Sequence, residues 1–168
     1  MQPDARSLFA CSRVALLAFL LCCALFARAG AGDEEDFRPY DREADAKAQI
    51  AALLEDRSSD KRILLTFGGN WCPDSRSLER RYRTPELAAV LEREFRTLHV
   101  DVGRSRRNRD IVEKYGNPID MGIPSVVLLA PDGTLLYTDH GSLSSAGRMS
   151  DPELIAFFER LAAGYPVP

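Results

Sequence analysis

A cysteine at position 72 is the residue of this chain whose surroundings point most directly to covalent chemistry. It lies in residues 67–75 (FGGNWCPDS), where a short apolar run is followed by the start of a helix. The first turn of a helix presents unpaired N–H groups that favour negative charge, and the thiolate form of a cysteine attacks disulfide bonds. We therefore expect Cys72 to be a reactive thiol, and the alternative is a packed, inert cysteine.

The residues that follow Cys72 bear on its reactivity. Pro73 is suited to the first turn of a helix, and Ser75 places a hydroxyl where it can donate a hydrogen bond to the sulfur. Asp74 acts in the opposite direction, because its negative charge disfavours a nearby thiolate. On balance we expect the start of this helix to favour the thiolate.

The N-terminal part of the chain has the layout of a cleaved secretory signal. Arg6 and Arg13 precede an apolar run over residues 14–26, and small residues follow at 27–31, which is the pattern of a signal peptide with its cleavage site. We predict a signal peptide over residues 1–29. The protein is then periplasmic or secreted, without a stable membrane span after cleavage.

Two alternatives for this segment stay open. The first is a transmembrane anchor, although the apolar run has about 13 residues and a membrane span needs about 20. The second is a lipid anchor on Cys22 or Cys23, although Leu21 or Cys22 stands where such signals normally have a small residue.

Cleavage leaves Cys72 as the single cysteine, because the others lie within the signal: Cys11, Cys22 and Cys23. A lone cysteine in an oxidising compartment cannot form an intramolecular disulfide, which suggests a reactive thiol or an intermolecular bond. Residues 30–41 are acidic and turn-rich, so we expect a flexible leader there. We expect residues 42–168 to form one domain.

The composition fits one globular domain that does not bind nucleic acid. The chain has 168 residues, of which 45% are hydrophobic, and this is enough for one ordinary core. The net charge is -3, whereas a nucleic-acid-binding domain normally carries a basic surface.

Hydrophobic periodicity and turn residues predict an alternation of helices and strands that would position Cys72. The expected elements are a helix over 44–54, a strand over 63–67, helices starting at 72–73 and at 84–85, a strand over 95–102, a helix over 111–115, strands over 125–130 and 134–138, and a helix over 151–163. Thr84 is the expected cap of the second of the two adjacent helices. Strands separated by helices predict parallel crossovers, and the closing hairpin predicts an antiparallel edge.

Two motifs in this order of elements resemble the thioredoxin family. Residues 71–75 (WCPDS) resemble its Trp-Cys-x-x-Cys active site, and residues 122–125 (GIPS) resemble its loop with a cis proline beside the active cysteine. The resemblance covers the chain from about residue 44 to the C-terminus, and the sequences of the two motif segments are similar to those of exported bacterial members. It implies an α/β protein with a thioredoxin-like fold, in which helices flank a central mixed sheet.

The resemblance also implies which residues form the site. Cys72 and Ser75 would be the catalytic pair, and the substrate-binding residues would be Trp71, Pro73, Ile123 and Pro124. An extended substrate strand would bind to the backbone next to Pro124, because proline itself has no N–H to donate. The alternative for Pro124 is an ordinary loop proline.

The sequence departs from the family pattern at two positions. Ser75 replaces the second active-site cysteine, and Thr66 stands where thioredoxins often have a buried aspartate. A neighbouring thiol would resolve a mixed disulfide at an effective concentration that can reach the order of 10⁵ M, and a serine hydroxyl cannot replace it. We therefore expect a monothiol exchange protein that is isomerase-like, captures client thiols or exchanges with glutathione.

The expected partners are client protein thiols or disulfides, glutathione or a redox partner protein. We predict no cofactor and no metal, because His99 and His140 with a single cysteine do not make a metal-binding constellation. A different hypothesis is a redox-inactive binding module or chaperone-like adapter, since the fold alone does not guarantee the chemistry. A one-cysteine peroxidase is less favoured, because the Thr- or Ser-bearing turn of such enzymes is absent before Cys72.

Four arginines follow the strand predicted over residues 95–102: Arg104, Arg106, Arg107 and Arg109. If that strand runs parallel to the one before Cys72, the arginines emerge at the same edge of the sheet, where open α/β sheets place their sites. They can then attract an anionic partner or favour the thiolate. The alternative is a solvated loop.

Overall fold

The computed structural model describes residues 37–104 and 106–164 of the chain. The predicted signal peptide and residues 30–36 of the predicted leader lie outside the described residues. In chain order the elements are α2 (Ala46–Glu55), β1 (Arg62–Gly68), α3 (Pro73–Arg81), α4 (Pro85–Glu94), β2 (Phe95–Asp101), α5 (Arg109–Lys114), β3 (Ser125–Leu129), β4 (Leu135–Thr138), the 3₁₀-helix η1 (Ser142–Arg148) and α6 (Asp151–Ala163).

The four strands form one mixed sheet in the order β2-β1-β3-β4. β1 and β2 are parallel, whereas β3 is antiparallel to both β1 and β4. The prediction of a mixed sheet flanked by helices is therefore confirmed.

The expected parallel crossover into β3 is wrong. β2 has seven residues and α5 has six, so the helix rises about 9 Å whereas the strand spans about 23 Å. A helix this short does not run the length of the strands, and the connection leads to a β3 whose first residue pairs with Phe67 at the end of β1. β3 therefore starts at the edge where β2 ends and runs in the opposite direction.

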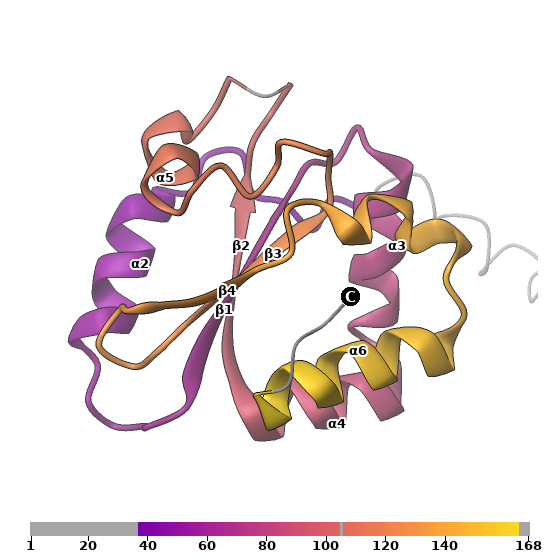
Figure 1. Cartoon of the computed structure of the whole chain (residues 1–168). Helices are drawn as coiled ribbons and strands as arrows, with labels where there is room; N and C mark the ends of the chain where they lie inside the picture. The colour runs from indigo at the N-terminus through magenta and orange to yellow at the C-terminus, as the bar shows by residue number, and fades with distance from the viewer. Residues whose placement is uncertain (1–36, 105, 165–168) are drawn as a thin grey trace, which may run out of the picture. The chain divides into compact units, whose positions relative to one another are not determined.

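Helices cover both faces of the sheet (Figure 1). Alternate side chains of β1 point to opposite faces: Ile63, Leu65 and Phe67 pack in a cluster with α2 and α5, and Leu64 packs in a cluster with α3, α4 and α6. These four side chains are fully buried. A central strand that is buried on both faces reads as a continuous apolar run, which is why residues 63–67 contain so little polarity.

Side chains cap two of the described helix starts, those of α2 and α6. Ser150 and Glu153 form a capping box at α6, and Asp45 accepts a hydrogen bond from the Ala48 N–H at α2. Thr84 precedes α4 as predicted, but its hydroxyl donates to the Arg81 carbonyl (2.8 Å) and makes no cap bond. Thr84 is therefore the N-cap residue of α4 as expected, but its hydroxyl bonds back to the preceding turn instead of capping the helix.

The 3₁₀-helix η1 has no counterpart among the predicted elements. Its sequence (SLSSAGR) is short and polar, so hydrophobic periodicity gives little signal for it. It is held in place by the carboxylate of Asp139, which accepts hydrogen bonds from the backbone N–H groups of Gly141 and Leu143 (both 3.1 Å).

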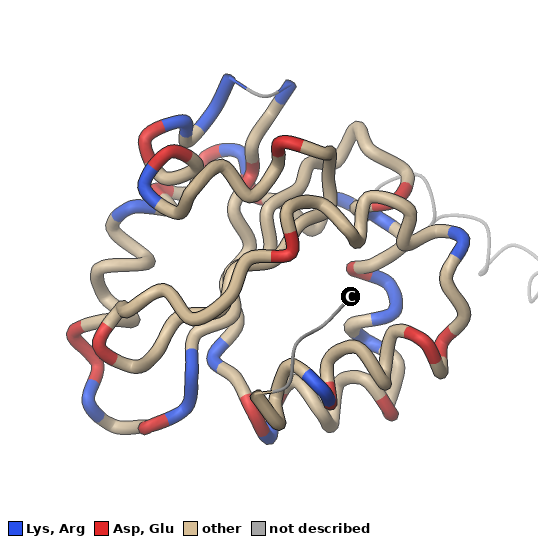
Figure 2. The backbone as a smooth tube through the Cα atoms, in the orientation of Figure 1, with Lys and Arg blue, Asp and Glu red and all other residues tan. Residues whose placement is uncertain are grey.

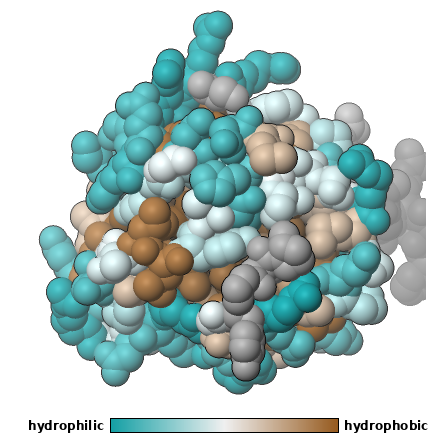
Figure 3. Space-filling model, viewed as in Figure 1, coloured by the Kyte–Doolittle hydropathy of each residue, from teal (hydrophilic) through white to brown (hydrophobic). Residues whose placement is uncertain are grey.

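Charged and apolar side chains are unevenly spread over the surface. Lys and Arg gather on the loop between β2 and α5 (Figure 2), and apolar atoms gather over the edge strand β4 (Figure 3), where Leu135 and Leu136 are exposed. Within residues 37–104 and 106–164, no helix has both the length and the apolar character that a membrane span requires.

Candidate functional site

Cys72 lies at the turn that connects β1 to α3. It is the N-terminal cap residue of α3, and Pro73 occupies the first helical turn. The backbone N–H of Cys72 donates to the Gly69 carbonyl (3.0 Å), which closes the turn after the strand. The side chain is 7% exposed and forms no disulfide. The thiol therefore lies at the positive end of the helix dipole with a narrow opening to solvent.

The loop before β3 lies directly against Cys72. The Cys72 thiol donates a hydrogen bond to the Ile123 carbonyl, with 3.4 Å between Sγ and oxygen, and the bond between Ile123 and Pro124 is cis. Pro124 is buried and Ile123 is half-buried. The structure thus brings together the two motifs that the sequence analysis singled out, which are 51 residues apart in the chain.

The exposed rim of the site is formed by Trp71 and Pro73. Trp71 is 48% exposed, and its indole N–H donates to the Gly103 carbonyl, in the loop after β2. Pro73 is exposed beside it. Trp71 and Pro73 therefore flank Cys72 in the chain, and the Ile123 carbonyl contacts its sulfur just before the cis bond to Pro124.

Ser75 does not hydrogen-bond to the Cys72 sulfur, which corrects the expectation from the sequence. Ser75 is fully buried, and its hydroxyl has no hydrogen-bond partner among the described residues. The Cys72 thiol instead points to the Ile123 carbonyl. The site therefore has one thiol and, in place of the second, a small buried hydroxyl.

A buried carboxyl group, Glu79, lies behind the site. Glu79 is on α3, two turns after Cys72, and is 2% exposed. Its Oε2 lies 3.4 Å from Nε2 of His99 on β2. Burial raises the pKa of Glu79 to about 8, against smaller opposing effects of Tyr40 and Arg83. Burial also lowers the pKa of His99, so both groups favour their neutral forms near neutral pH.

Tyr40 is a second buried side chain near this carboxyl, although its hydroxyl makes no hydrogen bond to a described residue. The side chain is 1% exposed although it comes from the predicted leader, and Asn70 holds its backbone through two hydrogen bonds, 3.0 Å at the N–H and 2.7 Å at the carbonyl. Burial, with smaller contributions from Glu79, Tyr82 and Cys72, raises the pKa of Tyr40 well above its usual range. A Cβ at Gly68 would collide with the Tyr40 hydroxyl.

Thr66 lies on β1, at the position where thioredoxins often have a buried aspartate. It is fully buried, and its hydroxyl lies 3.1 Å from the hydroxyl of Tyr82. The carboxyl that lies near the site thus comes from helix α3 instead of strand β1. Sequence reasoning missed Glu79 because it sits among charged residues (LERR), and its one signal is a spacing of two helical turns from Cys72, which places it on the same face of the helix.

The loop before β3 is fixed by Asp139, which sequence reasoning also missed. The Asp139 carboxylate accepts hydrogen bonds from the Val126 N–H (2.9 Å) and from the hydroxyl of Ser125, next to Pro124. Together with its bonds to Gly141 and Leu143, these contacts join the start of β3 to η1. Asp139 therefore positions the backbone that faces the Cys72 sulfur.

Each of the two histidines lies beside a single carboxyl group, Glu79 for His99 and Asp120 for His140. His99 packs between the rings of Tyr40 and Tyr82, with centroid distances of 5.9 and 6.1 Å, and His140 lies 3.7 Å from Asp120. The part of the chain that the structure describes contains no cluster of three or more His, Cys, Asp and Glu side chains that could hold a metal ion.

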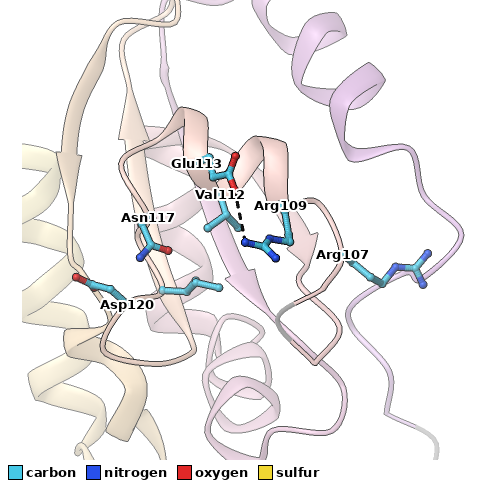
Figure 4. Close-up of a pocket in the computed structure, with 7 residues that line it drawn as sticks. Arg107, Arg109, Val112, Glu113, Asn117 and Asp120 are labelled. Atoms are coloured by element: carbon cyan, nitrogen blue, oxygen red, sulfur yellow. Dashed lines mark ion pairs between the residues drawn. The ribbon is translucent and has the colours of Figure 1, made fainter.

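A surface hollow lies between α5 and the loop that follows it (Figure 4). Its lining residues are Arg107, Arg109, Val112, Glu113, Asn117, Ile119 and Asp120. None of the predicted site residues lines this hollow.

Comparison with known proteins relates this architecture to a family. The profile of a thioredoxin-like family matches residues 45–131. A solved structure of a disulphide isomerase from Xylella fastidiosa Temecula1 is 38% identical, with a TM-score of 0.71, and the match covers 73% of this chain and 95% of that chain. No curated protein sequence matches the chain significantly.

The C-terminal domain of DsbD from Neisseria meningitidis shares the fold. Its reduced and oxidised structures are 22% and 23% identical to this chain, with TM-scores of 0.52 and 0.51. Each match covers 70% of this chain and 96% of that chain. The profile match over more than half of the sequence, the 38% identity and the mixed sheet with its flanking helices agree: the chain belongs to the thioredoxin-like family.

Proposed function

We propose that this protein performs thiol–disulfide exchange with Cys72 as its single reactive thiol. The observation that carries the proposal is the position of the Cys72 sulfur, at the start of α3 and 3.4 Å from the Ile123 carbonyl, beside Pro124. Ser75 stands where a second thiol would be needed for intramolecular resolution. The similarity to a structure described as a disulphide isomerase supports an isomerase-like role.

The exchange step requires no external oxidant or reductant. The Cys72 thiolate attacks one sulfur of a client disulfide, a new Cys72–client disulfide forms, the client S–S bond breaks, and the departing sulfur leaves as a thiolate that takes up a proton. A second thiol of the client, or a glutathione thiol, then attacks the mixed disulfide and restores Cys72. When a client thiol resolves the mixed disulfide, the client has exchanged one of its own disulfides for another. When glutathione resolves it at the client sulfur, the client keeps a disulfide with glutathione and one free thiol. In both cases the total number of disulfide bonds is unchanged.

Binding of the client falls to the residues around the sulfur. Trp71 and Pro73 provide exposed contact surface, and the backbone beside Ile123 and Pro124 can pair with an extended client segment. Glu79 holds a proton behind the site, close to Tyr40.

The test follows the adduct on Cys72. Protein incubated with oxidised glutathione, or with a peptide disulfide, should gain the mass of one mixed disulfide, while its turnover in a protein-disulfide reduction assay stays low. Cys72→Ala should lose the adduct and keep the fold. Ser75→Cys should raise turnover by supplying a resolving thiol, and Ser75→Ala is the matched control that should not.

One outcome favours a redox-inactive binding module instead. The parent would then form no adduct, and Cys72→Ala would bind clients as tightly as the parent does. That result would contradict the exchange proposal, because an exchange protein must depend on its thiol.

A further inference from the structure

The loop between β2 and α5 is joined to the tryptophan beside Cys72. The Trp71 indole N–H donates to the Gly103 carbonyl, and the guanidinium carbon of Arg104 lies 5.4 Å from the centroid of the Trp71 ring. A cation over an aromatic face is attracted to it. The first arginine of the loop is therefore held at the rim of the candidate site.

Two of the four arginines in this segment are neutralised within the chain. Arg107 lies 3.4 Å from the buried carboxylate of Asp101 and donates to the Arg42 carbonyl. Arg109 lies 3.7 Å from Glu113 on the same helix, and Figure 4 shows its side chain directed back to that carboxylate. These two arginines stabilise the loop and the start of α5.

Arg104 and Arg106 have no such neutralisation. Both side chains are exposed, and neither forms an ion pair with a carboxylate of residues 37–104 or 106–164. Figure 2 shows this loop as basic. Two carboxylates near Cys72 have partners of their own: Asp74 accepts from the Gly147 N–H (2.9 Å), and Asp120 lies beside His140.

We propose that Arg104 and Arg106 form a specificity-determining surface that selects polypeptide partners whose reactive cysteine is flanked by Asp or Glu. The inference rests on the proposed exchange at Cys72. A guanidinium binds carboxylates through directed, charge-assisted hydrogen bonds. The chain as a whole carries a net charge of -3, so without this local positive surface an acidic partner would be repelled.

The surface fits a polypeptide because apolar contacts accompany the charges. Trp71 is 48% exposed, and Met121, two residues before Ile123, is 75% exposed. Exposed apolar side chains therefore come from both segments that meet at the Cys72 sulfur. A partner segment of several residues can cover them while its acidic side chains reach the arginines, and a small thiol cannot do both.

The test uses three peptides that differ in charge alone. Each has one cysteine, flanked by Glu, Gln or Lys, and is supplied as a mixed disulfide with 2-nitro-5-thiobenzoate. Attack by Cys72 on the peptide sulfur forms the Cys72–peptide disulfide and releases one coloured thiolate, so the second-order rate is read directly. For the parent protein we expect the Glu peptide to react about 10-fold faster than the Lys peptide at low ionic strength, as electrostatic steering predicts.

Paired variants separate this local effect from total charge. In Arg104→Gln/Arg106→Gln the ratio of Glu to Lys rates should fall to about 2 or less. Arg57→Gln/Arg93→Gln removes two exposed arginines that precede β1 and β2, at the opposite end of the same strands, and should keep the parental ratio. Raising the salt concentration to about 0.5 M should bring the parental ratio of Glu to Lys rates closer to 1, because salt screens the attraction between the arginines and the peptide charges.

The outcomes distinguish the two proposals. A parent that reacts at similar rates with all three peptides would contradict the charge selection alone, as would an Arg104→Gln/Arg106→Gln protein that keeps the parental ratio. A parent that reacts with none of the peptides would instead overturn the exchange at Cys72, and the selection with it.

Discussion

At the scale of single residues, the site combines one thiol with an exposed rim and a buried hydroxyl. Cys72 is 7% exposed, whereas Trp71 beside it is 48% exposed. Ser75, at the position of the second thiol, is fully buried, so its hydroxyl is out of reach of a client. This hydroxyl has no hydrogen-bond partner among the described residues, and a buried hydroxyl in that state costs about 1–3 kcal/mol of stability.

Glu79 gives a prediction on the pH dependence of stability. Its folded pKa of about 8 lies above the ordinary value of 4.5, so the folded state binds an extra proton between these two pH values. The stabilisation from this proton is complete below pH 4.5 and is lost as the pH rises through 8. For a shift of this size the loss amounts to at most about 5 kcal/mol.

Glu79→Gln should remove this component. As the pH rises from 5 to 8, the variant should gain up to about 4 kcal/mol in free energy of unfolding relative to the parent. Urea denaturation at several pH values measures this gain. Glu86→Gln, which removes an exposed carboxylate on α4, is the control and should show little change of this kind. If the free energy of unfolding of Glu79→Gln changed with pH in the same way as that of the parent, Glu79 would not be a neutral carboxyl group in the folded protein.

At the scale of elements, the site depends on how β1, α3 and the start of β3 are joined. β1 ends beside Tyr40, and Cys72 is the N-cap residue of α3. The Ile123 carbonyl, which accepts the hydrogen bond from the Cys72 thiol, comes from the loop before β3. Asp139 connects that loop to η1 through N–H groups of both segments. The geometry of the site is therefore sensitive to a residue that does not touch the sulfur.

Asp139→Ala should destabilise the protein by about 2–4 kcal/mol, because it leaves the buried N–H groups of Val126, Gly141 and Leu143 without an acceptor. Asp139→Asn should lose less, since the amide keeps one acceptor oxygen. Urea denaturation measures both. Equal stability of the Ala variant and the parent would show that the carboxylate does not hold the loop.

At the scale of the whole molecule, we propose that the chain is exported and processed. Arg6 and Arg13, the apolar run over residues 14–26 and the small residues after it are the basis for this proposal. The mature protein should start near Gly30 or Gly32. Intact-mass analysis of the exported protein measures the start, and a mass that still includes residues 1–20 would rule out cleavage.

The packed part of the chain begins before the predicted domain boundary at residue 42. The unit extends from Arg38 onward, and Tyr40 is buried against the end of β1. Composition could not reveal this, because the acidic, turn-rich sequence around Tyr40 is typical of a solvated leader. One aromatic residue in such a segment becomes informative once its neighbours in space are known.

The sequence by itself determined the elements that follow strong local rules. Apolar runs bounded by glycine or proline gave β1 and β3, and Pro73 and Pro85 marked the starts of α3 and α4, because periodicity and proline geometry act within a few residues. The motifs at 71–75 and 122–125 identified Cys72 and Pro124 for the same reason. Their chemical types and spacing are readable without a fold.

Tertiary structure decided the features that depend on contacts between distant segments. The antiparallel direction of β3 depends on the path of the whole connection from β2, and the Cys72 thiol donates to the Ile123 carbonyl, where the sequence predicted a bond from Ser75. Burial gave Glu79 its raised pKa, although its sequence neighbours are charged. Desolvation and hydrogen bonding across the fold are properties of three-dimensional surroundings, which a linear pattern does not contain.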